Sequence, residues 1–138
     1  RVPADISAPS EQVLLDSGTD LRANVLLAPH HGSPGSASPP FITTVDPALI
    51  VVSAGRQRQG ILPAPQHLDS WQQQHRLPLV TAQMGTITCT SDSQGLRVTT
   101  FAGPAYLYNQ TSNTFKNTKC HLQECDNRFI LGRSCNSL

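Results

Sequence analysis

Two adjacent histidines, His30 and His31, are the residues of this chain whose type and setting best suit chemistry. They follow an apolar run, residues 24–28, that is typical of a buried strand, and Gly32 and Ser33 come directly after them. Imidazole is the commonest metal ligand in proteins and titrates near neutral pH, and loops at strand ends carry much of protein chemistry. The doublet therefore predicts a metal site or a proton-transfer site. The alternative is two structural histidines, one packed and one in solvent.

A carboxylate, Asp5, lies 25 residues before His30 in a similar setting. An extended segment, residues 2–6, ends there and a predicted helix begins. A carboxylate at this point can bind a metal, or it can accept hydrogen bonds from the helix N-terminus. The carboxyl ends of neighbouring parallel strands lie at one edge of a sheet. If the two strands are neighbours, Asp5 and the histidines converge.

The elements that must position these residues alternate in type along the chain. Helices are predicted to begin near Ser7, Ser38 and Pro65, because Ser and Pro are favoured at these first positions. Apolar runs predict strands over residues 21–28, 48–53 and 77–80, followed by a hairpin of residues 86–90 and 96–101. This alternation, ending in a hairpin, predicts an α/β layered domain.

The composition is typical of a single domain with an aliphatic core. The 138 residues are 38% hydrophobic but only 5% aromatic, and the net charge is +1. This length is enough to bury a core, and no apolar run approaches the roughly 20 residues of a membrane span. No block of basic residues marks an electrostatic nucleic-acid footprint, which leaves a nucleic-acid substrate open. The first residue is Arg rather than Met, and we expect a piece of a longer protein.

Three cysteines, Cys120, Cys125 and Cys135, gather near the C-terminus, with His121 beside the first of them. Zinc ligands usually come in closely spaced pairs, and here the first gap is one residue too long and the set is incomplete. A disulfide of Cys120 with Cys125 or Cys135, formed in an oxidising compartment, is favoured over structural zinc. Free thiols on a loose tail are the remaining alternative.

Roughly the first 100 residues resemble the C-terminal, metallo-β-lactamase-like domain of the DNA internalisation competence proteins of the ComEC type. The segments that carry this resemblance are DISAPSEQVLL at residues 5–15, LRANVLLAPHHGS at residues 21–33 and ALIVVSAG at residues 48–55. Thr81, residues 85–88 and Gly95 also resemble the closing strands of that domain.

The resemblance implies half of an αββα sandwich with a divalent metal centre, zinc or manganese, at the sheet edges. Asp5 matches a bridging aspartate, and the doublet of His30 and His31 matches a late histidine ligand. The sequence leaves open which of the two histidines binds metal. The other, with His30 as the catalytic candidate, would act as a general acid or orient a phosphate. Two metal ions would activate water and clamp a phosphodiester for in-line displacement.

Four further residues are candidates for phosphate contacts: Ser33, Ser36, Arg56 and Arg58. Serine hydroxyls donate hydrogen bonds to phosphate oxygens, and arginines meet a phosphate backbone. The alternatives are that the small serines permit a tight loop and that the arginines belong to a solvated polar loop.

The third predicted helix carries two histidines, His67 and His75, on either side of Trp71. A ligand pair is one hypothesis, because His67 and Trp71 are one helical turn apart. The surface of an ordinary amphipathic helix is the favoured interpretation for both histidines.

The chain also departs from the family pattern. It contains no H-x-H-x-D-H motif, so at most three ligands are present and the dinuclear site is incomplete. Ala4 stands where the family usually has Gly. A His-Pro-His-Pro stretch of the family corresponds to Leu62-Pro63-Ala64-Pro65 here, which removes both imidazoles and keeps both prolines. A catalytically inactive member is therefore a second hypothesis.

The resemblance implies a half metallo-β-lactamase-like domain over residues 1–103, and the change in composition predicts a Cys/Asn/Thr-rich tail of uncertain order over residues 104–138. The resemblance implies a bacterial inner-membrane protein of DNA uptake, with this domain soluble and periplasmic. Its partners would be single-stranded or duplex DNA and the remainder of the parent membrane protein. The alternatives are a non-catalytic nucleic-acid-binding or scaffolding module, or a related soluble metal-dependent phosphodiesterase. A half-domain leaves a sheet face uncovered, so we expect the isolated chain to dimerise or be poorly stable.

Overall fold

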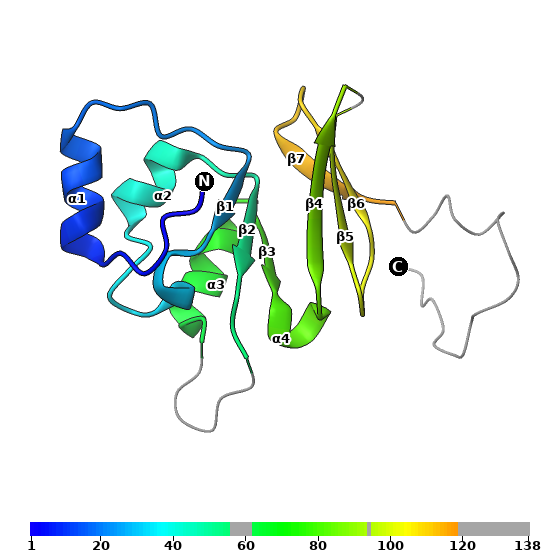
Figure 1. The fold of residues 1–138 in the computed structure, drawn as a ribbon, viewed down its shortest axis with the longest axis horizontal. Helices are drawn as coiled ribbons and strands as arrows, with labels where there is room; N and C mark the ends of the chain where they lie inside the picture. The colour runs from blue at the N-terminus through cyan, green and yellow to red at the C-terminus, as the bar shows by residue number, and fades with distance from the viewer. Residues whose placement is uncertain (56–61, 94, 119–138) are drawn as a thin grey trace, which may run out of the picture.

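The computed structural model describes residues 1–55, 62–93 and 95–118, which form three stacked layers (Figure 1). Helices α1, α2 and α3 cover one side of a three-stranded sheet, and a four-stranded sheet covers the other side. The helices are α1 (Ala8–Asp16), α2 (Pro39–Val45), α3 (Pro65–Gln73) and the short α4 (Thr81–Met84). The strands are β1 (Val25–Leu27), β2 (Leu49–Val52), β3 (Leu77–Val80), β4 (Ile87–Asp92), β5 (Gly95–Thr100), β6 (Tyr106–Asn109) and β7 (Thr114–Asn117).

The central sheet is parallel, with the order β1-β2-β3, so the three strands end at the same edge. The N-terminal segment, residues 1–4, runs alongside β1 and is hydrogen-bonded to β1 and to the turn that follows it. Leu27 donates its backbone N–H to the Arg1 carbonyl at 3.0 Å, and His30 donates its own to the Ala4 carbonyl at 3.1 Å. Asp5 therefore lies at the carboxyl edge, next to the turn that contains the histidines.

The central sheet separates two apolar clusters, because side chains alternate between the faces of a strand. On β2, Ile50 and Val52 face the helices, where they pack with Leu26 and Trp71. Leu49, from the opposite face of β2, packs with Leu79 and Val98 against the second sheet. Full burial of one such aliphatic side chain stabilises a fold by about 1.5–3 kcal/mol.

The second sheet is an antiparallel meander in the order β4-β5-β6-β7. Its inner face contributes Ile87, Val98, Tyr106 and Phe115 to the cluster beneath the parallel sheet. The domain end predicted at residue 103 therefore falls inside this sheet, since β6 and β7 come from the predicted tail. Both strands are only four residues long, and the exposed Leu107 on the outer face of β6 interrupts the alternation of apolar and polar residues, so their sequence pattern is weak.

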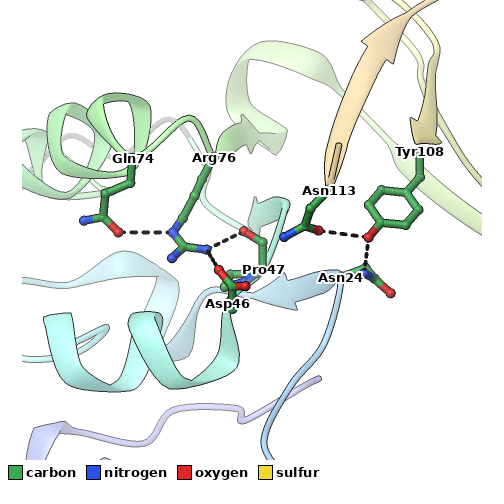
Figure 2. A network of polar contacts seen from close by, with 7 residues as sticks. All are labelled: Asn24, Asp46, Pro47, Gln74, Arg76, Tyr108 and Asn113. Carbon is green, nitrogen blue, oxygen red and sulfur yellow. Dashed lines mark hydrogen bonds and ion pairs between the residues drawn. The ribbon is translucent and has the colours of Figure 1, made fainter. Parts of the chain in front are cut away.

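A polar network ties the layers together at the amino ends of the parallel strands (Figure 2). Arg76, just before β3, donates from one guanidinium nitrogen to the Asp46 carboxylate at 3.1 Å and to the Pro47 carbonyl at 2.8 Å. Asn24, just before β1, donates to the Tyr108 hydroxyl at 2.6 Å, which links the parallel sheet to β6. These contacts join α2, β3 and the two sheets at this end of the molecule.

Candidate metal site at the carboxyl edge

Asp5 and His31 face each other at the carboxyl edge of the parallel sheet. Nε2 of His31 lies 3.7 Å from Oδ1 of Asp5, and both side chains are exposed, at 46% and 70%. The other ring nitrogen, Nδ1, lies 2.5 Å from the Ser53 carbonyl oxygen at the end of β2. A carbonyl oxygen only accepts, so Nδ1 carries the proton. Nε2 then faces the Asp5 carboxylate with a lone pair in the neutral ring or with a second proton in the charged ring. A backbone carbonyl that accepts from one ring nitrogen is the usual support of a metal-binding histidine.

His30 is exposed beside this pair and is held by a different contact. Its backbone N–H donates to the Ala4 carbonyl at 3.1 Å, and its ring centroid lies 6.5 Å from that of His31. The geometry therefore favours His31 as the partner of Asp5 and leaves the ring of His30 facing solvent next to it.

The histidines lie in a tight turn, Pro29–Gly32, with a left-handed backbone. The φ angles of His30, His31 and Gly32 are 46°, 56° and 73°. A left-handed backbone is strained for side-chain-bearing residues, and such strain persists only where the surroundings enforce it. A Cβ at Gly32 would come within 2.7 Å of the Pro63 Cβ and 3.6 Å of Trp71, so only glycine fits this position.

Glu11 supports the loop that follows the turn, a role that the sequence analysis missed. Its side chain is fully buried, and its carboxylate accepts the backbone N–H groups of Ala37 at 2.6 Å and Ser38 at 2.9 Å. These groups precede the first turn of α2, where a negative charge is favourable. In the sequence, Glu11 has the pattern of an ordinary acidic residue in the first turn of a helix, so no local signal marked this role.

The two candidate serines differ in their surroundings. Ser36 is 2% exposed, and its hydroxyl donates to the Pro29 carbonyl at 2.8 Å. Ser33 is half-buried, and its hydroxyl oxygen lies 3.2 Å from the hydroxyl oxygen of Ser36. For Ser36 this geometry favours the tight-loop alternative over a phosphate contact. Arg56 and Arg58 lie outside the described residues.

The substituted His-Pro-His-Pro stretch contacts the core. Ala64 is 2% exposed, and Leu62 packs against the cluster beneath the helices. The Ala64 backbone N–H donates to the Gly32 carbonyl at 2.9 Å, so this segment rests against the site turn. Apolar side chains thus occupy both positions at which the family resemblance implies imidazoles.

His67 is not an ordinary surface residue, and the sequence interpretation is wrong on this point. Its Nε2 lies 3.0 Å from the Ser33 carbonyl oxygen, and its ring stacks on Trp71 at a centroid distance of 5.4 Å and an interplanar angle of 7°. Trp71 itself is 1% exposed. His75 is exposed beyond the end of α3, as expected of a surface residue.

Asp5 and His31 are two potential metal ligands, which is fewer than a closed site needs. Within residues 1–55, 62–93 and 95–118, no group of three or more His, Cys, Asp and Glu side chains is arranged to hold a metal ion. Cys89 on β4 is a free thiol whose pKa is raised by partial burial. Cys120, Cys125 and Cys135 lie outside the described residues. Across those same ranges, no helix is long and apolar enough to cross a membrane.

Comparison with known proteins finds relatives that are much longer than this chain. Over 95 residues, 68% of the chain, it is 34% identical to the uncharacterized protein YcaI of Escherichia coli (strain K12). Over 83 residues, 60% of the chain, it is 32% identical to ComE operon protein 3 of Bacillus subtilis (strain 168). The chain spans 13% and 11% of the lengths of these relatives. No family model and no solved structure matches it.

The second of these matches supports the relationship to ComEC-type competence proteins that the sequence pattern predicts. It does not bear on the metallo-β-lactamase-like assignment, which stays a prediction.

Proposed function

We propose that this chain is part of a bacterial DNA-uptake protein, and that Asp5 and His31 supply two ligands of a divalent metal centre, zinc or manganese. At this centre DNA phosphodiesters would be bound or hydrolysed. The observation that carries the proposal is the pairing of His31 Nε2 with Asp5 Oδ1 at 3.7 Å while Nδ1 donates to Ser53. Two ligands of one tetrahedral ion with bonds near 2.0 Å are roughly 3.3 Å apart, so a small shift would let both bind one ion.

A metal bound here would activate water and neutralise charge on a phosphodiester. The residues of the chain hold the ligands in place. The Ser53 carbonyl fixes the tautomer of His31, and the left-handed turn directs the imidazole toward Asp5. His30, exposed beside the pair, is placed to donate or accept a proton at a bound phosphodiester.

The rest of the centre would come from outside the described residues. The family resemblance implies further ligands from a preceding half-domain, and the relatives are long enough to contain one. The same relationship suggests an inner-membrane parent protein, with this domain on the periplasmic side and in contact with the incoming single-stranded or duplex DNA. These statements about the whole protein extend the proposal beyond the matched segment.

A second candidate function is a non-catalytic nucleic-acid-binding or scaffolding module with the same fold. It is favoured by Leu62 and Ala64, whose side chains pack into the core where the family resemblance implies imidazoles. In this case the site turn keeps its shape for structural reasons, and binding to DNA does not depend on metal.

Assays of DNA binding and hydrolysis separate the two candidates. The whole domain, this chain together with the preceding half-domain that the resemblance implies, is incubated with labelled single-stranded and duplex DNA in the presence of Mn²⁺ or Zn²⁺, with and without EDTA. The proposal predicts that binding or hydrolysis requires metal and is lost in Asp5→Ala and His31→Ala. Asp16→Ala, which removes an exposed carboxylate of α1, is the matched control and should behave like the wild type. DNA binding that is unchanged by EDTA and by both site variants would support the non-catalytic module instead.

A further inference from the structure

The turn that contains the histidines is anchored through two consecutive carbonyl groups by one segment, residues 64–67. The Ala64 backbone N–H donates to the Gly32 carbonyl at 2.9 Å, and Nε2 of His67 lies 3.0 Å from the Ser33 carbonyl. Because a carbonyl only accepts, Nε2 of His67 carries the proton in this contact. The first anchor is a backbone contact. The second is a side-chain contact to a carbonyl that also accepts from the Ser36 backbone N–H at 3.1 Å and the Ser36 hydroxyl at 3.0 Å.

The side chain of Trp71 in turn holds the ring of His67. It stacks almost parallel on Trp71, one helical turn along α3, and Trp71 is 1% exposed. Trp71 also lies beneath Gly32, 3.6 Å from the position a Cβ would occupy there. The stack therefore forms a rigid support between the hydrophobic core and the turn.

We propose that His67 is a positioning residue of the candidate metal site. It holds the Ser33 carbonyl, and through it the strained turn of His30, His31 and Gly32, so that Nδ1 of His31 stays bonded to Ser53. Strained left-handed residues persist where several contacts over-determine them. The Ser33 carbonyl also accepts from Ser36, and His67 adds the side-chain contact that ties this carbonyl to α3. The inference rests on the proposed function insofar as His31 binds metal, but the orientation of the His31 ring is measurable without metal.

Two substitutions separate the two contacts of His67. His67→Phe keeps an aromatic ring for the stack on Trp71 and removes the donor to Ser33. His67→Gln keeps an N–H donor at the end of a side chain of similar reach and removes the stack. His75→Asn is the matched control, because it removes an exposed imidazole just beyond the same helix and leaves a residue that tolerates the left-handed backbone there, φ 58°.

The first readout is the tautomer of His31 in the metal-free intact chain, taken from the ¹⁵N chemical shifts of its ring. In the wild type, His67→Gln and His75→Asn, the Nδ1–H form should dominate. In His67→Phe the Nε2–H form should appear as well, because His31 is released from Ser53. A residue that only contributes to stability would not change this signature.

The second readout is Zn²⁺ affinity by calorimetry. His67→Phe should bind about 10- to 100-fold more weakly than the wild type, as is typical when a support of a metal ligand is lost. His67→Gln should recover most of that loss. The fluorescence of Trp71, the only tryptophan in the chain, shows whether each variant keeps its folded core.

A His67→Phe variant that folds and keeps both the wild-type tautomer and the wild-type affinity would overturn the inference. If His67→Phe does not fold, His67→Gln decides: a folded His67→Gln that loses the Nδ1–H form of His31 contradicts the role of the donor, and one that keeps it supports that role. If the wild-type chain binds no Zn²⁺, the titration is repeated on the whole domain with the preceding half-domain that the resemblance implies. No binding there would count against the proposed function, and the tautomer comparison would still judge the role of His67.

Discussion

The residues of the site turn are held in a strained conformation. Three consecutive residues, His30, His31 and Gly32, have left-handed φ angles, and two of them carry bulky side chains. This conformation directs the ring of His31 between Ser53 and Asp5. Strain of this kind is concentrated at functional sites, where the rest of the fold compensates for it.

Gly32→Ala should be strongly destabilising, because the added Cβ combines a left-handed backbone with a 2.7 Å approach to Pro63. Overpacking and the left-handed penalty together predict a loss of about 2–4 kcal/mol in the free energy of unfolding. Urea denaturation followed by Trp71 fluorescence measures it. Gly35→Ala is the control, since nothing lies within 4 Å of its Cβ position, and it should change stability little. Equal effects of the two substitutions would contradict this account of the turn.

Ala4→Gly should stabilise the chain by up to about 1 kcal/mol, because Ala4 has a φ of 57° and glycine adopts this conformation without strain. Thermal unfolding of the variant tests this. Ala8→Gly in the first turn of α1 should instead lower stability, since glycine disfavours a helix. A loss of stability in Ala4→Gly would show that the left-handed strain at Ala4 is negligible.

At the scale of the elements, Glu11 joins α1 to α2 and to the loop behind the site. Its carboxylate accepts two consecutive backbone N–H groups, the buried one of Ala37 and the partly buried one of Ser38. Ala37, one of these donors, has a left-handed φ of 54°, so the loop conformation also depends on this contact.

Glu11→Ala should lower the free energy of unfolding by about 3 kcal/mol, because hydrogen bonds to a charged acceptor contribute about 1.5–3 kcal/mol each. Glu11→Gln should cost less, since its amide oxygen still accepts one bond. Chemical denaturation gives both values. Asp16→Ala, at the exposed end of the same helix, serves as the reference, and a loss as large as that of Glu11→Ala would rule out a specific role for Glu11.

The elements themselves were largely predictable from the sequence. The β-branched run 48–53 contains β2, and the helices predicted near Ser38 and Pro65 are α2 and α3. The roles of Glu11 and His67 were not predictable, because each depends on partners 26 to 34 residues away. An acidic residue and a histidine on helices are indistinguishable by local pattern from solvated ones.

At the scale of the whole molecule, the antiparallel sheet has one buried and one exposed face. Phe115 packs inward against the cluster of Leu49, Leu79 and Val98, whereas Leu107, on the neighbouring strand, is 42% exposed. The meander therefore covers the side of the parallel sheet that the helices leave open.

Phe115→Ala should lower the free energy of unfolding by about 2 kcal/mol, less than for a fully buried phenylalanine because the ring is half-buried. Leu107→Ala should change it by less than about 0.5 kcal/mol, as is usual for exposed positions. Denaturant titrations of the two variants compare the faces directly. Similar losses for both would mean that the outer face is covered as well, for example in a dimer.

Part of the candidate site was also predictable at this scale. The order of strands and helices led to the expectation that Asp5 and the histidines converge. In the structure, Oδ1 of Asp5 lies 3.7 Å from Nε2 of His31. The choice between His30 and His31 could not come from sequence, because it depends on the backbone angles of the turn and on the position of Ser53. The predicted domain boundary at residue 103 lies between β5 and β6, because the short strands β6 and β7 alternate too weakly to be recognised in the sequence.

The most direct test of the central claim is a calorimetric titration of the intact chain with Zn²⁺ and, separately, Mn²⁺. The account predicts binding to the wild type that weakens at least about 10-fold in Asp5→Ala and in His31→Ala, while His30→Ala keeps an affinity close to that of the wild type. Folding of each variant is verified by Trp71 fluorescence. Unchanged affinity in both Asp5→Ala and His31→Ala would contradict the claim that these two residues bind the metal.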